Sequence, residues 1–352
     1  MPFDPVRFAL VGYGFGGRTF HAPFLASLTE CKLAGVVTTS PERRAQVAAD
    51  HPGARLYDDL AAVVADGVEA VAISTPAATH TALTDEALRL GLHVVCDKPF
   101  ALDASAAMRS VELAQETGRL LSPYQNRRWD SDFLTLRQLA DTGRLGTINR
   151  FESRFERFKP DPGPKPAGGG MLLDLGSHLV DQALQLLGEV RRVYAETTVL
   201  ASGLDDDVFI ALTHASGARS HLWCSTRQPA PGPRFRVAGT AAAYVVEAAL
   251  DGQEDRLRAG ETPATAGERW GREPESRWGY LKAGRVRGPV ETLPGAWQTF
   301  YSEFAAAVRG DGRVPVAATD AVATARVLDV ARQSATTGTV VTLEAGASGH
   351  GG

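Results

Sequence analysis

The chain has little cysteine, no long apolar run and no block of like charge. Its 352 residues include only 3 cysteines. Cys31, Cys96 and Cys224 cannot all pair within one chain and form no CxxC or His/Cys cluster, so we expect reduced thiols and no metal site. No apolar run approaches the ~20 residues that a membrane span needs, and the first residues lack a basic segment followed by an apolar one. We therefore expect a cytoplasmic protein that does not enter membranes.

Charge is spread evenly along the sequence. The chain carries 37 Lys and Arg against 41 Asp and Glu, for a formal net charge of -4. Without a basic block, a nucleic-acid partner is disfavoured. The length exceeds that of one ordinary domain and suffices for two, each with its own core.

The first third of the chain alternates between strand-like and helical segments. This alternation predicts a doubly wound parallel sheet with crossover helices, of about six strands, in a domain that spans residues 1–125. The expected strands are residues 7–11, 32–38, 70–74, 93–96 and 120–124. The expected helices are residues 18–28, 41–49, 79–91 and 105–117.

The rest of the chain, residues 126–345, has a different pattern, and residues 346–352 are expected to be a frayed tail. Runs of alternating polarity predict a large, open, mostly antiparallel sheet in a second α/β domain. Proline and glycine in residues 160–170 oppose helices and central strands, which predicts a loop over the active site. Residues 251–292 are expected to be an irregular excursion. The expected strands are residues 148–158, 190–200, 207–214, 219–224, 234–239 and 243–247. The expected helices are residues 131–139, 171–187, 296–308 and 318–334.

A glycine-rich turn follows the first expected strand. Its spacing matches G-x-G-x-x-G, which a dinucleotide site needs for a tight turn, for close approach to a pyrophosphate and for packing of the next helix on the strand. Free N–H groups at the start of that helix would bind the anion. A plain turn is the alternative, but the position at the head of a βαβ unit favours a dinucleotide site. The residues expected to line it are Gly12, Tyr13, Gly14, Phe15, Gly16 and Gly17.

The end of the second expected strand bears on the choice of cofactor. An acid there would bind the ribose hydroxyls of NAD, whereas this chain has Thr38, Thr39 and Ser40. These hydroxyls, the start of the next helix and the guanidinium of Arg43 or Arg44 could hold the 2′-phosphate of NADP. The pattern favours NADP over NAD. The alternative is that both arginines are simply solvated on an exposed helix.

Two stretches contain candidate catalytic residues. Asp97, Lys98 and Pro99 follow a strand at the carboxyl edge of the sheet, where such sheets bind ligands. The ammonium of Lys98 could stabilise alkoxide charge on a substrate oxygen, although a solvated lysine is the commoner outcome. Asp174 and His178 are four residues apart in an expected helix and so share one face. The imidazole could act as a general base for a hydroxyl proton, with a helix cap or a buried histidine as the alternative.

Together these motifs resemble those of the Gfo/Idh/MocA oxidoreductases, and the resemblance covers nearly the whole chain. It rests on the glycine turn, on Ser74-Thr75-Pro76 with Thr79-His80, on residues 91–95, on Asp97-Lys98-Pro99 and on the Asp174/His178 helix. Residues 19–23 and 126–133 resemble the NADP-dependent scyllo-inositol dehydrogenase branch of that family.

The resemblance implies a Rossmann domain and a C-terminal α/β domain whose open sheet forms dimers or tetramers. It implies an NADP-dependent enzyme, with NAD possible, that transfers a hydride between nicotinamide and a ring carbon of a polyol or sugar. Scyllo-inositol and scyllo-inosose are the favoured pair. The alternatives are another sugar dehydrogenase or an aldose or ketose reductase of this family and, less favoured, a cofactor-binding sensor without turnover.

The resemblance also implies roles for individual residues. Lys98 is the catalytic lysine, Asp174 positions the substrate and His178 accepts the proton. The residues implied to line the cofactor are Thr75, Pro76, His80 and Asp97. The residues implied to lie near the nicotinamide and the polyol are Asn126 and Arg127. The family usually has Glu where this chain has Asp97, which puts a contact with the nicotinamide ribose in doubt.

Overall fold

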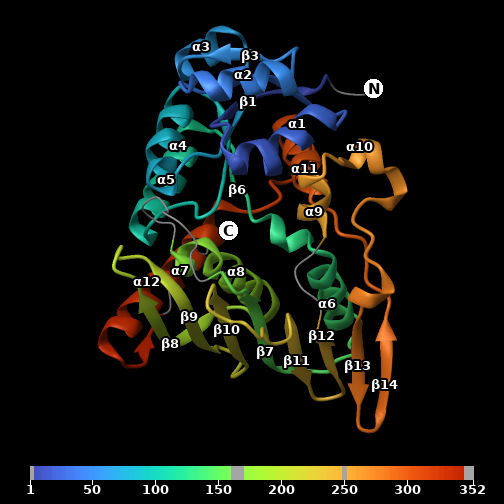
Figure 1. Ribbon diagram of the computed structural model, residues 1–352. Coiled ribbons are helices and arrows are strands. Elements are labelled where there is room, and N and C mark those ends of the chain that lie inside the picture. Colours follow the sequence, from blue (N-terminus) through green and yellow to red (C-terminus); the bar gives the residue numbers. More distant parts are fainter. Residues whose placement is uncertain (1–3, 160–169, 248–251, 345–352) are drawn as a thin grey trace. The chain divides into compact units, whose positions relative to one another are not determined.

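The computed structural model describes residues 4–159, 170–247 and 252–344 (Figure 1). The stretch predicted as a loop over the active site, apart from Gly170, therefore lies outside the described residues, and so does the tail predicted at 346–352.

The chain forms two compact units, each assembled from separate stretches. The first unit contains the described residues of 1–131, 251–272 and 294–322. The second unit contains the described residues of 132–250, 273–293 and 323–352. A single boundary after residue 125 does not describe this division, because two later segments return to the first unit.

The first unit is built on a six-stranded sheet with the order β3-β2-β1-β4-β5-β6, and all of its strand pairs are parallel. The strand order reverses at β1 and β4, so the carboxyl ends of these strands flank the point at which such sheets bind dinucleotides. Sequence analysis did not locate β3, because its three residues include two exposed ones and carry no apolar run. The strands are β1 (Val6–Val11), β2 (Cys31–Val37), β3 (Arg55–Tyr57), β4 (Ala70–Ile73), β5 (His93–Cys96) and β6 (Leu121–Pro123).

Helices connect these strands, and local sequence signals set their ends. The carboxylate of Asp103 accepts the N–H of Ala106 at the start of α5, and Gly118, with a φ of 64°, ends that helix. The connecting helices are η1 (Gly17–His21), α1 (Ala22–Ser27), α2 (Pro41–Asp50), α3 (Leu60–Ala65), η2 (Ala77–Thr79), α4 (His80–Arg89), α5 (Ala104–Thr117) and η3 (Asn126–Trp129).

Segments from much later in the chain complete the core of the first unit. Phe8 of β1 contacts Tyr301 and Phe304 of α11, with ring centroids 5.8 and 6.0 Å apart. Trp297, at the start of α11, is fully buried. The later helices of this unit are α9 (Gln253–Arg258), α10 (Pro263–Ala266), η4 (Gly267–Arg269) and α11 (Gln298–Val308).

The second unit contains a nine-stranded sheet with the order β14-β13-β12-β11-β7-β10-β9-β8-β15. Neighbouring strands are antiparallel except β7 and β10, which are parallel. This matches the predicted open, mostly antiparallel sheet. The strands are β7 (Ile148–Glu156), β8 (Val190–Val199), β9 (Asp205–His214), β10 (Arg219–Ser225), β11 (Phe235–Gly239), β12 (Ala243–Val246), β13 (Gly279–Ala283), β14 (Val286–Val290) and β15 (Val341–Thr342).

Helices pack on this sheet, and α8 contacts both β7 and β10. The shared core is formed by apolar residues of the strands and of α6, α7, α8 and α12, among them Phe151, Leu179, Ile210 and Leu328. The helices are α6 (Ser131–Asp141), α7 (Met171–Asp174), α8 (Gly176–Leu187), η5 (Glu275–Arg277) and α12 (Ala318–Thr337).

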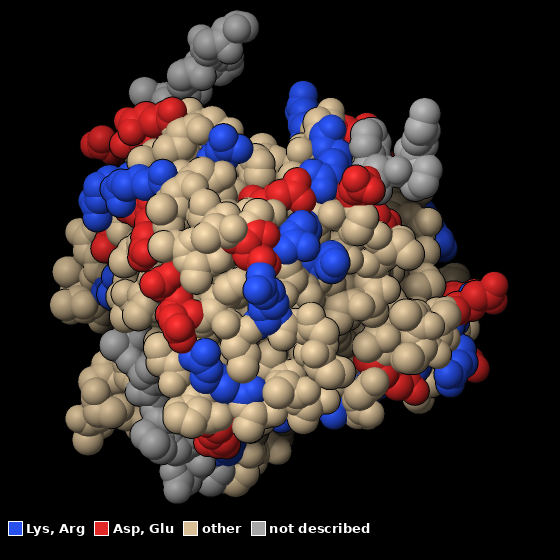
Figure 2. Space-filling model, turned by 90° about the horizontal axis from the view of Figure 1, so that it is seen from above, with Lys and Arg blue, Asp and Glu red and all other residues tan. Residues whose placement is uncertain are grey.

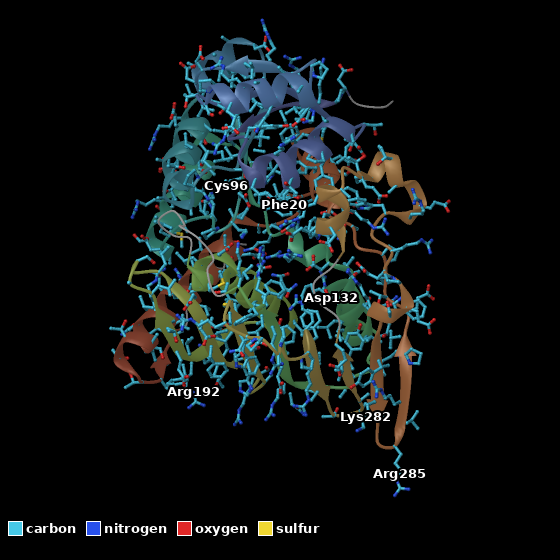
Figure 3. The ribbon with its side chains drawn as sticks, in the orientation of Figure 1. Phe20, Cys96, Asp132, Arg192, Lys282 and Arg285 are labelled. Carbon is cyan, nitrogen blue, oxygen red and sulfur yellow. The ribbon has the colours of Figure 1, made fainter. Side chains whose placement is uncertain are left out.

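The prediction that residues 251–292 are irregular was wrong. The described part of this stretch contains α9, α10 and the hairpin of β13 and β14, which extends one edge of the nine-stranded sheet. Lys282 lies on this hairpin and Arg285 at its tip (Figure 3). The hairpin escaped prediction because most of its residues are exposed, so it lacks an apolar alternation.

None of the described helices is both long enough and apolar enough to cross a bilayer. Lys and Arg are interspersed with Asp and Glu on the face shown in Figure 2, without a broad field of one sign.

Candidate cofactor and active site

The glycine turn has the geometry that its spacing predicts. Gly12 has a φ of 96°, and a Cβ on it would lie 2.3 Å from the carbonyl oxygen of Ser74. A Cβ on Gly17 would lie 2.2 Å from the carbonyl oxygen of Gly12. A side chain is therefore excluded at both positions. A Cβ on Gly14, in contrast, would meet only the guanidinium of Arg43, with Nη2 at 3.8 Å.

The open space at Gly14 is a cradle that a side chain would fill, beside a chain segment that becomes helical at Phe15. Backbone N–H groups and a nearby guanidinium suit a phosphate group. The residues present thus fit the pyrophosphate of a dinucleotide. Tyr13 contributes only its backbone to this turn, because its side chain is buried and its hydroxyl donates to Asp50 at 2.9 Å.

The two arginines after β2 have different surroundings. Arg44 donates from Nη1 to the carbonyl oxygen of Thr38 at 3.2 Å and pairs with Asp58 at 2.8 Å. Arg43 instead extends toward Gly14. Ser40 caps α2 by accepting the N–H of Arg43 at 3.4 Å. Of the two guanidinium groups, that of Arg43 faces the glycine turn.

A charged cluster lies beneath the glycine turn, at the carboxyl ends of β4 and β5. Asp97 accepts hydrogen bonds from the hydroxyl of Ser74 at 2.9 Å and from the N–H of Lys98 at 2.8 Å. Its Oδ2 is 3.3 Å from the place of a Cβ on Gly16. Nε2 of His21 lies 3.3 Å from the same oxygen, at ion-pair distance but outside hydrogen-bond alignment.

Burial alone would raise the pKa of Asp97, but the adjacent His21, Lys98 and His80 lower it well below its usual range. Asp97 therefore stays ionised at neutral pH. Its short side chain points under the glycine turn, where it is engaged by Ser74 and the backbone of Lys98.

His21 was missed by sequence analysis. It ends η1, a π-helical turn of a type often found at functional sites, and its side chain is fully buried. Nδ1 lies 2.6 Å from the hydroxyl oxygen of Tyr301, and the ring packs on Tyr124 with centroids 4.4 Å apart. The resemblance at residues 19–23 includes this histidine but gives it no role, because its partners lie after β5, after β6 and in α11.

His80 joins the two loops that follow β4 and β5. It is 1% exposed, and its Nδ1 and Nε2 each lie 2.8 Å from a carbonyl oxygen, of Pro99 and Thr75 respectively. Carbonyl oxygens only accept, so both nitrogens must carry hydrogen and the ring is a cation. Burial lowers its pKa, but Cys96, Asp97 and the Pro99 carbonyl raise it to about 9. Both ring nitrogens are therefore committed to the backbone.

Lys98 comes two residues after Cys96 (Figure 3), the last residue of β5, and its peptide bond with Pro99 is cis. Its side chain is partly exposed at the carboxyl edge of the sheet. Thr75 and Pro76 lie at the same edge, after β4, where the hydroxyls of Thr75 and Thr79 are 2.7 Å apart. The sheet thus brings together the glycine turn, Thr75 and Lys98, as their positions after strands predict.

Asn126 and Arg127 are buried in η3. The guanidinium of Arg127 pairs with Glu254 at 3.0 Å and with Asp130 at 3.5 Å. It also lies 5.0 Å from the ring centroid of Trp297. Its charge is engaged by acids of the first unit.

In the second unit, Asp174 and His178 lie on either side of a helix break. The single helix predicted at 171–187 was wrong: α7 ends at Asp174, α8 begins at Gly176, and Leu175 separates them. His178 lies in the first turn of α8, is 3% exposed, and packs near Phe155 with ring centroids 6.4 Å apart. Asp174 and His178 therefore belong to two helices and not to one as predicted.

The start of α7 is fixed by an acid from β9. Asp205 accepts the N–H of Leu172 at 2.5 Å, and a Cβ on Gly170 would lie 2.3 Å from its Oδ1. Gly170 is thus required by close approach of this carboxylate. Across the described residues, no group of three or more His, Cys, Asp or Glu side chains could hold a metal ion.

Comparison with known proteins identifies the family. The family described as "Oxidoreductase family, NAD-binding Rossmann fold" matches residues 6–125, and the "GFO/IDH/MocA C-terminal domain" matches residues 133–245. Scyllo-inositol 2-dehydrogenase (NADP(+)) IolW of Bacillus subtilis is 31% identical over 97% of this chain and 97% of its own length. The uncharacterized oxidoreductase YdgJ of Escherichia coli is 35% identical, over 94% of this chain and 97% of its own.

A solved structure gives the same result. The Bacillus subtilis protein yvaA superposes with a TM-score of 0.91 at 30% identity, over 98% of this chain and 100% of that chain. Sequence motifs, fold and relatives therefore agree, and the chain belongs to the Gfo/Idh/MocA family of NAD(P)-binding oxidoreductases.

Proposed function

We propose that the chain is an NADP-dependent dehydrogenase of a ring polyol, with scyllo-inositol and scyllo-inosose as its substrate pair. The observation that carries the proposal is the gathering of an open glycine turn and Lys98 at the carboxyl ends of neighbouring parallel strands. The similarity to the Bacillus subtilis relative, which bears this activity in its name, supports the substrate.

The surroundings of the glycine turn support NADP. No acid stands at the end of β2, where Thr38, Thr39 and Ser40 offer hydroxyls, and Arg43 extends to Gly14. In this proposal the pyrophosphate lies on the glycine turn and Arg43 binds the 2′-phosphate. Arg44 is held by Asp58 and plays no such role.

Each proposed catalytic residue has one task in polyol oxidation. When bound, the cofactor supplies the acceptor for the hydride that leaves the alcohol carbon. The C–H bond breaks with its electron pair, and the hydroxyl proton passes to the imidazole of His178, which leaves a ketone. The ammonium of Lys98 stabilises negative charge on the oxygen. Asp174 accepts a hydrogen bond from a substrate hydroxyl and so orients the ring.

His80 and Asp97 support Lys98 and do not touch substrate in this scheme. His80 ties the backbone next to Lys98 to the loop after β4, and Asp97 accepts the N–H of Lys98. Both fix the backbone from which the lysine side chain extends. Such positioning matters because catalysis depends on the orientation of the reacting groups.

A different sugar or polyol is the alternative within the same family. Inositol 2-dehydrogenase of Rhizobium meliloti is 29% identical over 63% of this chain and 69% of its own length. A second relative is thus named for activity on an inositol. The same scaffold can serve several substrates, because specificity belongs to the site and not to the fold.

Steady-state assays of the purified protein with NADP and NAD against inositols and common sugars test this proposal. We expect the highest kcat/KM for scyllo-inositol with NADP. A higher kcat/KM for another sugar would overturn the proposed substrate, and a higher kcat/KM with NAD would overturn the proposed cofactor. Absence of turnover across the panel, with both cofactors still bound, would favour a sensor.

A further inference from the structure

A second arginine reaches the glycine turn from a distant part of the chain. Arg258 is the last residue of α9, which contacts η1 (Figure 1). Its Cζ lies 4.6 Å from the ring centroid of Phe15, within the range of a cation–π contact. Phe15 stands between Gly14 and Gly16 in the motif, and it is 58% exposed. A guanidinium thus lies over the part of the turn that faces solvent.

The exposed ring of Phe15 packs on a chain of aromatic rings that leads into the core. Phe20 (Figure 3) meets it edge-on, with centroids 5.5 Å apart, and packs in turn edge-on against Trp297 at 5.9 Å. Trp297 is fully buried in the core of the first unit. The surface on which Arg258 rests is therefore a fixed extension of that core.

The guanidinium of Arg258 is itself held by Glu254. Its Nε and Nη2 donate to Oε1 of Glu254 at 3.1 and 2.6 Å, while Oε2 accepts Nη2 of Arg127 at 3.0 Å. Burial would raise the pKa of Glu254, but the charges of Arg127 and Arg258 lower it. The carboxylate therefore stays charged at neutral pH and fixes the plane of Arg258.

The helix that carries Arg258 is anchored at its other end. Gln253 is fully buried; its Oε1 accepts the N–H of Trp297 at 3.0 Å, and its Nε2 donates to the carbonyl oxygen of Trp129 at 3.3 Å. An amide bonded at both ends fixes the start of α9. Arg258, one and a half turns later, is thereby preorganised over the glycine turn.

Arg258 keeps donors for a further acceptor. Two of the five N–H groups of an arginine bond to Glu254, and among the described residues no acceptor is bonded to Nη1. The side chain is 50% exposed. Free donors of a fixed guanidinium, next to a backbone that suits a phosphate, match the chemistry of a pyrophosphate.

We propose that Arg258 binds the pyrophosphate of the cofactor and closes the glycine turn from the solvent side. The proposal rests on the proposed function only in that the ligand is a nicotinamide dinucleotide. The two arginines at the turn then have different roles. Arg43 binds the 2′-phosphate, which only NADP has, whereas Arg258 binds the pyrophosphate, which NADP and NAD share.

Isothermal calorimetry on Arg258→Gln, with NADPH and NADH as separate ligands, tests the assignment. We expect the Kd of both to rise about ten-fold or more, the effect of losing a charge-assisted hydrogen bond. Adenosine 2′-monophosphate lacks the pyrophosphate, so its affinity should not change. Arg258→Lys, which keeps the charge but not the fork of donors, should lie between wild type and Arg258→Gln.

Arg256→Gln is the matched control. Arg256 lies on the same helix but pairs with Glu261 at 2.8 Å. This variant should bind both dinucleotides as wild type does. Unchanged affinities in Arg258→Gln, with an unchanged melting temperature, would overturn the proposal. Weaker NADPH alone would move Arg258 to the 2′-phosphate and would likewise overturn it. Failure of every polyol in the substrate panel would leave this result standing, since binding is measured without turnover.

Discussion

Nη2 of Arg43 lies 3.8 Å from the place that a Cβ on Gly14 would occupy. Because the motif leaves that place open, the guanidinium stands at the rim of the proposed phosphate cradle. The neighbouring Arg44 cannot take this role in the same conformation, since Asp58 and the carbonyl of Thr38 hold it. Substitution of Arg43 therefore tests the choice of cofactor, and substitution of Arg44 is its control.

We expect Arg43→Ala to weaken NADPH binding by about 1–3 kcal/mol, the scale of a charge-assisted hydrogen bond, and to leave NADH binding nearly unchanged. Calorimetric titration with each cofactor measures both effects. Arg44→Ala serves as the control and should change neither Kd by more than about two-fold. Tighter binding of NADH than of NADPH by the wild-type protein would remove the argument for a 2′-phosphate site.

His80 should make stability depend on pH above neutrality. Its folded pKa of about 9 exceeds the unfolded value of about 6.5. Protonation therefore favours the folded state: the contribution is fully present below about pH 6.5 and is lost as the pH rises through about 9. Urea unfolding between pH 6 and 10 should show this decline. His80→Gln, which has no titrating ring, should not show this part of it.

The charge on His80 can be observed directly. ¹⁵N chemical shifts of its imidazole at pH 7.5 should report hydrogen on both ring nitrogens, because both face carbonyl oxygens at 2.8 Å. A neutral tautomer at that pH would contradict the cationic assignment and the stability argument together.

The fold could be predicted from the sequence where a local pattern decides it. Glycine spacing identified the turn, because φ at Gly12 and the closeness of Gly17 to Gly12 are local constraints. Alternating polarity identified strands such as β9, in which every second residue is buried. Strand β3 and the hairpin of β13 and β14 lack that pattern, because they lie at or next to the edge of their sheets and bury few side chains.

The site was predictable only in part, because its arrangement depends on contacts between distant segments. Arg43 and Arg44 are neighbours in the sequence, and the contacts of Arg44 with Asp58, after β3, and with the Thr38 carbonyl distinguish them. Likewise no pattern connects Phe15 with Arg258. The break at Leu175, between α7 and α8, likewise has no obvious signal in the sequence.

The exposed face of the nine-stranded sheet should form a subunit interface. One face packs on α8, and the other presents Phe209 and Trp223, whose ring centroids are 5.1 Å apart, with Arg154 stacked 3.8 Å from the Trp223 ring. Half-exposed aromatics with arginine are typical of interface centres. We expect dimers or tetramers in light scattering, and Trp223→Glu should shift them toward monomer. Arg285→Glu, at the tip of the β13–β14 hairpin, should leave the mass unchanged, whereas a wild-type monomer at micromolar concentration would contradict the interface.

Lys98→Met should lower turnover without loss of cofactor affinity. The methionine keeps the length of the side chain but lacks the charge that is proposed to stabilise the substrate oxygen. Rates of polyol oxidation and calorimetric Kd values for NADPH give the two readouts. A variant that lost NADPH binding in proportion to its activity would assign Lys98 to the cofactor and not to the substrate.

For His178, a catalytic role and a purely structural role predict clearly different results. Oxidation needs a base, so the rate should rise with pH as the imidazole loses its proton. His178→Ala should reduce kcat by about 10²–10⁴, the usual worth of general-base assistance, while the Kd of NADPH stays nearly constant. Combined with Lys98→Met, the two losses should not add, because both groups are proposed to act on one oxygen and its proton.

A histidine that only fills the core next to Phe155 predicts the reverse: a lower melting temperature, with normal activity per folded molecule. Turnover and thermal unfolding of His178→Ala, measured on the same sample, decide between these roles, and near-normal turnover would end the assignment of His178 as the base.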